Sequence, residues 1–167
     1  ESGISQRGIP GFGTGFVKVD SDEHDESGMI TEDYKMRNDM NEKRLKKRKL
    51  LLSEYEAAEL IGPEKYTHLV VGWGSTYGVL KEFIETSGSD DTSFLNVKQV
   101  FPLHDDLIPY FKQAKSVTVV ENNATGQLAS LLKTELDIHV DHSILKYSGE
   151  PFSIEEIEQK LKEVMLA

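Results

Sequence analysis

The chain has 167 residues, 38% of them hydrophobic, and its 29 Asp and Glu against 19 Lys and Arg give a net charge of −10. This length fits one modest globular domain with an additional segment better than two full domains. No stretch reads as a membrane span or a secretory signal, so we expect a cytoplasmic protein with no membrane partner. Because the chain has no cysteine, any thiolate zinc site or iron–sulfur cluster would have to sit on a partner.

The first part of the chain, residues 1–65, is predicted to be a Gly-rich and charged linker with a long helix. The Gly-rich opening at residues 1–15 has little apolar content to bury, and we expect the chain to be cut from a longer one and this part to join an upstream domain. Thr31 is a plausible N-cap, with Glu32 and Asp33 in the first turn. One long helix or two shorter ones should then run to about Leu60, and Gly62-Pro63 ends the pattern at the domain boundary.

A cationic run, NEKRLKKRKLLL at residues 41–52, lies in the middle of this predicted helix. Such a run can bind phosphates. Acidic residues flank it on both sides and the whole chain is acidic, so we interpret it as a solvated helix face and predict no nucleic-acid binding.

The second part, residues 66–167, alternates strand-like and helical patterns. Four runs are predicted to be strands: THLVVGW (67–73), NVKQVF (96–101), SVTVVE (116–121) and LDIHV (136–140). Apolar stripes predict helices after Gly78 and after Gly126, and the pair Ser153 and Glu156 is a capping box that begins the last helix. This order predicts a three-layer α/β/α fold with a mainly parallel sheet, preceded by an irregular and helical segment.

Ligands and partners usually meet the carboxyl ends of parallel strands, which makes the loop GWGSTYG at residues 72–78 a candidate site. Its G-x-G-x-x-x-G spacing is one residue longer than the dinucleotide fingerprint. The next predicted strand ends in Val100-Phe101-Pro102, without the acidic residue that a ribose requires. We therefore favour a tight turn over a dinucleotide site, although backbone around Gly72, Gly74, Ser75 and Thr76 could bind an anion or a partner.

Two polar clusters suggest metal or acid–base chemistry at first sight. DSDEHDESG at residues 20–28 fails the EF-hand spacing, since His24, Asp25 and Thr31 occupy its fifth, sixth and twelfth positions. A single His is also poor support for zinc, so no metal site is predicted. His104 with Asp105 and Asp106 is either an acid–base pair or a helix start, and we favour the start. His139 is predicted to lie on the exposed face of a strand.

The loop ENNATGQ at residues 121–127 allows two interpretations. Asn122, Asn123 and Thr125 could cap the helix that follows. Glu121 and Gln127 add hydrogen-bonding groups that suit a polar ligand or a partner loop. No nucleophile elbow, HExxH, Walker loop or kinase signature occurs, so no complete catalytic set is present and none of these residues is predicted to be catalytic.

Six segments stand in a fixed order along nearly the whole chain: SDEHDESG (21–28), KRLKKRKLL (43–51), VGWGSTYGVLKEFI (71–84), VFPLHDDLIPYF (100–111), VVENNATGQLASLL (119–132) and ILKYSGEPFSIEEI (144–157). In this order they resemble the C-terminal part of the alpha subunit of 2-oxoacid:ferredoxin oxidoreductases, notably of the 2-oxoglutarate type. The resemblance implies that residues 66–167 have a fold similar to the C-terminal domain of transketolases.

The same resemblance implies what the complete enzyme does. It would use thiamine diphosphate and Mg to decarboxylate a 2-oxoacid, pass electrons through iron–sulfur clusters to ferredoxin or flavodoxin, and release acyl-CoA from coenzyme A. Those cofactors would be held largely by the beta subunit, and this chain alone would bind none and be inactive. The resemblance places Glu23, His24 and Asp25 just before the second part, as candidates to face the active site, while the GST and ENN loops would contact another domain or an anion.

A different class of function remains open from the residues alone. The glycine loop and ENNATGQ could form a self-contained α/β module that binds a small anionic ligand such as a nucleotide or acyl-CoA. The candidate contact residues are the same in both interpretations: Gly72, Gly74, Ser75, Thr76, Glu121, Asn122, Asn123 and Gln127.

Overall fold

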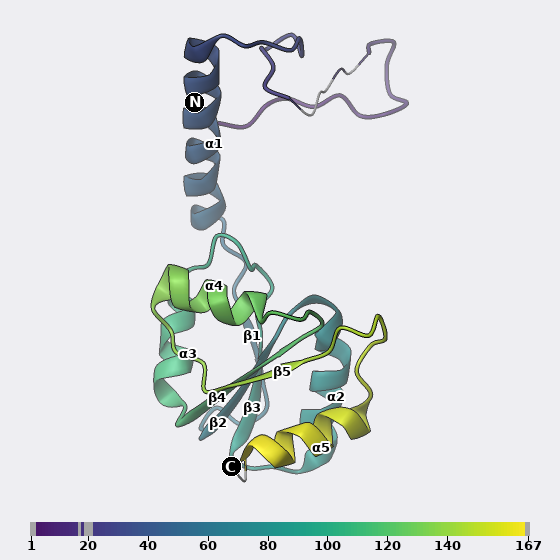
Figure 1. Cartoon of the computed structure of the whole chain (residues 1–167), viewed down its shortest axis with the longest axis vertical. Coiled ribbons are helices and arrows are strands. Elements are labelled where there is room, and N and C mark those ends of the chain that lie inside the picture. Colours follow the sequence, from purple (N-terminus) through teal and green to yellow (C-terminus); the bar gives the residue numbers. More distant parts are fainter. Residues whose placement is uncertain (1–2, 17, 19–21, 166–167) are drawn as a thin grey trace. The chain divides into compact units, whose positions relative to one another are not determined.

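The computed structural model describes residues 3–16, 18 and 22–165 (Figure 1). Asp20 and Ser21 of the polar cluster, and the first two residues of the Gly-rich opening, lie outside the described residues. The chain forms two compact units, one up to Glu54 and one from Tyr55 onward. None of the helices among the described residues combines the length and the apolar character that crossing a membrane requires.

The first unit contains one long helix, α1 (Tyr34–Ser53). Asp33 is its N-cap and accepts a hydrogen bond of 2.7 Å from the Met36 amide. Thr31, the expected cap, lies two residues before the observed cap, and its hydroxyl accepts a hydrogen bond of 3.2 Å from the Asp33 amide. The expectation that the helix runs to about Leu60 is wrong, because residues 59–61 form a strand of the second unit. No residue of α1 is buried.

The second unit is built on a five-stranded sheet in the order β1-β3-β2-β4-β5. Its strands are β1 (Glu59–Ile61), β2 (His68–Gly72), β3 (Thr92–Asn96), β4 (Ser116–Glu121) and β5 (His142–Leu145). β1 pairs antiparallel with β3 at one edge, and the remaining pairs are parallel. The predicted mainly parallel sheet is therefore confirmed.

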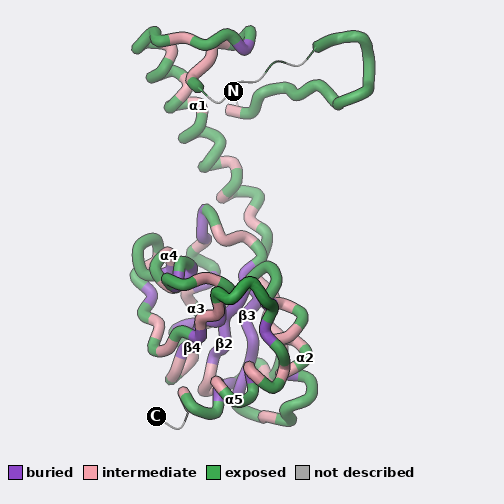
Figure 2. Tube along the Cα trace, turned by 45° about the vertical axis from the view of Figure 1, so that its right-hand side comes forward, coloured by how far each residue is buried: buried purple, intermediate pink, exposed green. Residues whose placement is uncertain are grey.

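Helices cover both faces of this sheet, as the alternating pattern predicts (Figure 1). One apolar core joins Val71 and Val119 to α3 (Ile108–Gln113) and α4 (Gln127–Leu136). The other joins Val70 and Val120 to α2 (Tyr77–Ser87) and α5 (Ile154–Met165). Neighbouring residues of one strand thus enter opposite cores, as the pleat requires. The buried residues concentrate in the central strands between these layers (Figure 2).

Two of the four predicted strands are misplaced. NVKQVF is wrong as a strand beyond its first residue, because β3 consists of TSFLN at residues 92–96. Thr92, Ser93 and Asn96 are polar and buried, and the Ser93 hydroxyl donates to the Pro63 carbonyl, 30 residues earlier in the chain, at 2.6 Å. The apolar alternation of the sequence does not reveal such a strand.

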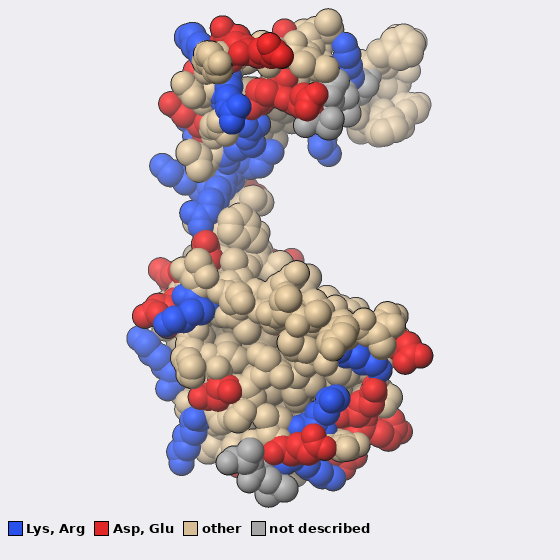
Figure 3. Space-filling view, viewed as in Figure 1, with Lys and Arg blue, Asp and Glu red and all other residues tan. Residues whose placement is uncertain are grey.

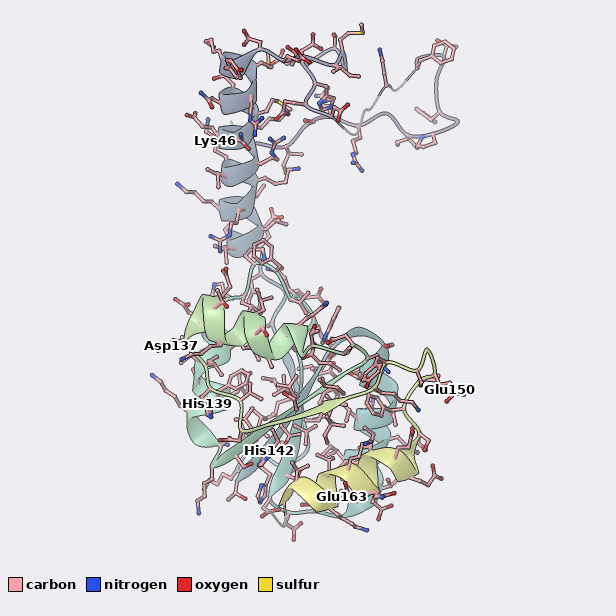
Figure 4. The ribbon with its side chains drawn as sticks, in the orientation of Figure 1. Lys46, Asp137, His139, His142, Glu150 and Glu163 are labelled. Atoms are coloured by element: carbon pink, nitrogen blue, oxygen red, sulfur yellow. The ribbon has the colours of Figure 1, made fainter. Side chains whose placement is uncertain are left out.

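LDIHV is also wrong as a strand. Leu136 ends α4, and Asp137 follows in the left-handed region with φ of 53°. His139 therefore lies in the connection to β5 and not on a strand, although its side chain is exposed as expected (Figure 4).

The helix starts predicted from local sequence at η2 and α5 are confirmed. In the capping box of α5, the Ser153 amide donates to Glu156 Oε2 at 2.8 Å and the Glu156 amide donates to Ser153 Oγ at 3.2 Å. Asp105 and Asp106 lie in the first turn of the short helix η2 (Asp105–Leu107), which leads directly into α3.

Candidate functional site

The glycine loop joins β2 to α2 through a tight turn, η1 (Gly74–Thr76). A Cβ on Gly72 would lie 2.5 Å from Leu80 Cδ1 and 2.6 Å from Thr76 Oγ1, so only glycine fits there. Gly74 has a φ of +56°. The buried Thr76 hydroxyl bonds the Trp73 amide and carbonyl, both at 3.0 Å. Close packing therefore explains Gly72 and Thr76 without a ligand.

The next strand along the chain, β3, ends at Asn96 and not at Val100, as the sequence led us to expect. This residue also supplies no carboxylate for a ribose. The argument against a dinucleotide site therefore rests on Asn96 in place of Val100.

Glu121, at the end of β4, is fully buried. Its carboxylate accepts hydrogen bonds from the backbone amides of Leu128 at 2.8 Å and Ala129 at 3.2 Å, and from the Asn123 side chain at 2.8 Å. A carboxylate in this position satisfies amides that the first turn of α4 leaves without partners, and it complements the helix dipole. Glu121 is thus an anchor for α4.

Asn123 completes the same anchor. Its side-chain oxygen accepts from the amides of Thr125, Gly126 and Gln127, at 3.1, 2.8 and 3.3 Å. Of the two interpretations of ENNATGQ, the helix-capping one accounts for Asn123 and Glu121. Asn122 and Gln127 remain exposed.

The glycine loop and the ENNATGQ loop meet at the carboxyl edge of the sheet, as the parallel topology requires. Together they line a shallow depression of about 190 Å³, formed by Trp73, Ser75, Thr76, Asn122, Asn123 and Gln127. The Ser75 hydroxyl lies 3.5 Å from Asn122 Oδ1 and joins the two loops. No charged side chain lines this depression.

Trp73 is the lining residue that our sequence reasoning missed. It is the only tryptophan of the chain and is 36% exposed, although it directly follows a buried strand. A bulky residue between two loop glycines is the signal that could have revealed it. An aromatic ring among neutral hydroxyl and amide groups suits contact with a polypeptide or a neutral polar group better than acid–base chemistry.

Glu23, His24 and Asp25 lie in a small hairpin of the first unit, where His24 bridges Ile30 in an antiparallel pair. Arg44 of α1 binds both carboxylate oxygens of Glu23, at 3.2 and 2.8 Å. Hydrogen bonding to this guanidinium lowers the pKa of the Glu23 carboxyl below its usual value.

Asp25 stabilises the turn of this hairpin. Its carboxylate accepts from the Ser27 hydroxyl at 2.6 Å and from the amides of Ser27 and Met29, and these bonds lower the pKa of Asp25. Buried His24 Nδ1 has no hydrogen-bond partner among the described residues. The structure therefore engages Glu23 and Asp25 in contacts within the first unit.

His104 serves as the N-cap of η2. Its Nδ1 accepts from the Asp106 amide at 3.2 Å, and its ring stacks on Tyr55 with 4.5 Å between ring centroids. This arrangement supports the helix start over an acid–base pair. Within residues 3–16, 18 and 22–165, no three His, Asp or Glu side chains come together in a way that could hold a metal ion.

No family model matches the chain. It is 33% identical, over 99% of its length, to the alpha subunit of 2-oxoacid:ferredoxin oxidoreductase 1 from Sulfurisphaera tokodaii, and 32% identical, over 99%, to that of oxidoreductase 2 from Aeropyrum pernix. The chain spans 26% of the length of each of these relatives.

Among solved structures, it matches a 2-oxoglutarate:ferredoxin oxidoreductase from Magnetococcus marinus with 2-oxoglutarate, coenzyme A and succinyl-CoA bound. The TM-score is 0.72 at 27% identity, over 99% of this chain and 29% of that one. The resemblance that the six segments indicate is thereby confirmed, and this chain is homologous over nearly all its length to part of the alpha subunit of 2-oxoacid:ferredoxin oxidoreductases.

Proposed function

We propose that this chain is a supporting part of the alpha subunit of a cytoplasmic 2-oxoacid:ferredoxin oxidoreductase that converts 2-oxoglutarate to its acyl-CoA. The observation that carries this proposal is the similarity to alpha subunits over 99% of the chain. The choice of 2-oxoglutarate is supported by the Magnetococcus marinus enzyme, which has that oxoacid bound.

A supporting role agrees with the chemistry at the sheet edge. Glu121, the carboxylate nearest the depression, is buried and accepts three hydrogen bonds from α4 and its cap. What remains accessible is Trp73 with neutral hydroxyl and amide groups. We assign this edge to contact with another domain or with the beta subunit, since aromatic rings and few charges are typical of the centre of such interfaces.

The chemistry itself belongs to groups that other polypeptide would hold. Thiamine diphosphate would supply the electron sink for decarboxylation, and iron–sulfur clusters would carry the electrons to ferredoxin. We assign both, with Mg, to the beta subunit, because this chain contains no cysteine for a cluster and no group of metal ligands among its described residues.

One hairpin of the first unit is proposed to face the active site. The Glu23–Arg44 pair and the Asp25 turn fix the hairpin, while one ring nitrogen of His24 has no partner among the residues that the structure describes. In the assembled enzyme, His24→Gln should lower the turnover of the oxoacid, whereas His139→Gln, at an exposed histidine of the second unit, should not. Equal rates for both variants would remove His24 from the site.

The experiment that tests the main proposal compares the isolated chain with the complete alpha–beta enzyme. The complete enzyme should reduce an acceptor dye with 2-oxoglutarate, thiamine diphosphate and coenzyme A, and should prefer 2-oxoglutarate to pyruvate. The chain alone should show no decarboxylation. Activity of the chain alone would refute the supporting role, and a preference for pyruvate would refute the substrate.

A second candidate is a module that binds a nucleotide or acyl-CoA at this depression through neutral groups alone. Ser75, Asn122 and Gln127 could donate hydrogen bonds to such a ligand beside Trp73. Calorimetry of the chain with nucleotides and coenzyme A at millimolar concentration decides the question, and no heat of binding would eliminate this candidate.

A further inference from the structure

Helix α1 concentrates positive charge on an otherwise acidic chain. It contains eight Lys and Arg but only two Asp and Glu, a net charge of +6. Since the whole chain carries −10, everything outside α1 sums to −16. Lys and Arg cover much of this helix in the space-filling view (Figure 3).

Six of these cations fall within residues 43–49, in the segment KRLKKRK. At 100° per residue they project around the whole circumference of the helix. Like charges three and four positions apart, such as Lys43 and Lys47, weaken an isolated helix by about 0.2–0.5 kcal/mol per pair. An anionic partner would remove this repulsion.

Three of the lysines, Lys46, Lys47 and Lys49, are exposed and form no ion pair with any described residue. Lys46 is exposed in the middle of the helix (Figure 4), although Gly3 lies close to its Cβ. By contrast, Arg44 is bound by Glu23, and Lys43 donates to the Ser5 hydroxyl at 2.6 Å. The three lysines, which we call the lysine collar, are thus available to a partner.

We infer that the lysine collar is a docking surface for a small acidic electron-carrier protein. This inference rests on the proposed function, in which electrons leave the enzyme on such a carrier. The collar and the carrier would be complementary in charge, and complementary charge accelerates encounter between proteins.

The composition of the collar favours a transient partner over a permanent subunit. Lysine is depleted in the cores of stable interfaces, where its flexible, strongly hydrated side chain is costly to immobilise. Weak electron-transfer complexes have small interfaces. Exposed Leu45, within the cationic segment, adds apolar contact, which a protein surface can use better than a phosphate backbone can.

The test uses the assembled enzyme with the triple variant Lys46→Gln, Lys47→Gln and Lys49→Gln. The matched control is Lys65→Gln, Lys112→Gln and Lys115→Gln, which removes the same charge at exposed lysines of the second unit. Oxidation of the oxoacid is followed with an acidic ferredoxin and, separately, with methyl viologen, a small acceptor that needs no docking.

The collar variant should raise the KM for ferredoxin about tenfold at low ionic strength, in line with the gain that electrostatic steering gives. The effect should fade as salt is added, because exposed charges are screened. Methyl viologen reduction should stay unchanged, and the control variant should behave like wild type with both acceptors.

Four other results would overturn the inference, each for a different reason. An unchanged KM for ferredoxin removes the docking role alone. Failure of the collar variant to assemble, seen by gel filtration, makes the helix a permanent subunit interface. Salt-dependent binding of duplex DNA that disappears in the collar variant assigns the surface to nucleic acid. No methyl viologen reduction by the wild-type enzyme refutes the proposed function, and the inference with it.

Discussion

At the scale of single residues, Glu121 shows that a carboxylate at a strand end can serve the fold entirely. It is fully buried and accepts from two backbone amides of α4 and from the side-chain amide of Asn123. Glu121→Ala should lower the free energy of unfolding by about 3 kcal/mol, because each buried donor left without an acceptor costs about 1–3 kcal/mol.

Urea unfolding measures this loss, with Glu64→Ala as the control at an exposed glutamate of the same unit. The control should change stability by less than about 0.5 kcal/mol. If Glu121→Ala is equally mild, Glu121 does not anchor the helix and is free for a ligand.

Two glycines of the same loop should respond in opposite directions to alanine. Gly72→Ala places a Cβ 2.5 Å from Leu80 Cδ1 and should destabilise by about 1–3 kcal/mol through overpacking. Gly78 lies in α2 with nothing within 4 Å of an added Cβ, so Gly78→Ala should stabilise by about 0.5 kcal/mol. Thermal unfolding of both variants measures these two changes in stability. A tolerated Gly72→Ala would contradict the packing role.

At the scale of elements, the capping box of α5 gives a prediction for acid stability. The Lys146 ammonium contacts both oxygens of Glu156, at 2.8 and 2.7 Å. The hydrogen bond from Lys146 is the main cause that lowers the pKa of Glu156 below its ordinary value of 4.5, and the hydrogen bond from the Ser153 amide is the second cause. A lowered folded-state pKa stabilises the fold above pH 4.5, and this stabilisation is lost as the pH falls through the folded-state value.

Glu156→Gln should therefore be less stable than wild type at pH 7, and the difference should shrink as the pH falls below 4.5. Thermal unfolding between pH 3 and 7 measures both curves, with Glu64→Gln as the exposed control. A difference that stays constant with pH would show that Glu156 acts through its shape and not through its charge.

The elements that the sequence predicts well are those whose signal is local. Apolar spacing identifies α2 and α4, the Ser153–Glu156 pair fixes the start of α5, and apolar runs mark β2 and β4. β3 and β5 are missed because TSFLN and HSIL carry polar residues that interrupt an apolar run; in β3 the buried Ser93 hydroxyl finds its acceptor at Pro63, far away in the chain.

Some contacts of the candidate site could be predicted from the sequence, and others could not. That Ser75 and Asn122 meet follows from the parallel topology, which brings successive carboxyl ends to one edge. The bonds of Glu121 to α4 depend on how one buried side chain is oriented. The Arg44–Glu23 pair joins residues 21 apart in the chain, and no local pattern indicates that distance.

At the scale of the whole molecule, the two units differ in how much apolar surface they bury. Every buried hydrophobic side chain among the described residues lies between Tyr66 and Leu161, in the second unit. The first unit contains α1, none of whose residues is buried, and the small hairpin in which His24 pairs with Ile30. Because burial of apolar surface is the main stabilising term of folding, the second unit should hold nearly all of the stability.

A fragment of residues 55–167 should thus unfold in urea in one transition, with the midpoint and slope of the full chain, since the slope follows the surface exposed on unfolding. Starting at Tyr55 keeps the stacked contact with His104.

A separate fragment of residues 1–54 should lose much of the α1 helicity in circular dichroism, because an isolated helix with adjacent cations is marginal in water. Added salt should restore part of that helicity by screening the lysine collar. A fragment 55–167 that unfolds gradually, or a helix α1 that stays intact alone, would contradict this division of stability.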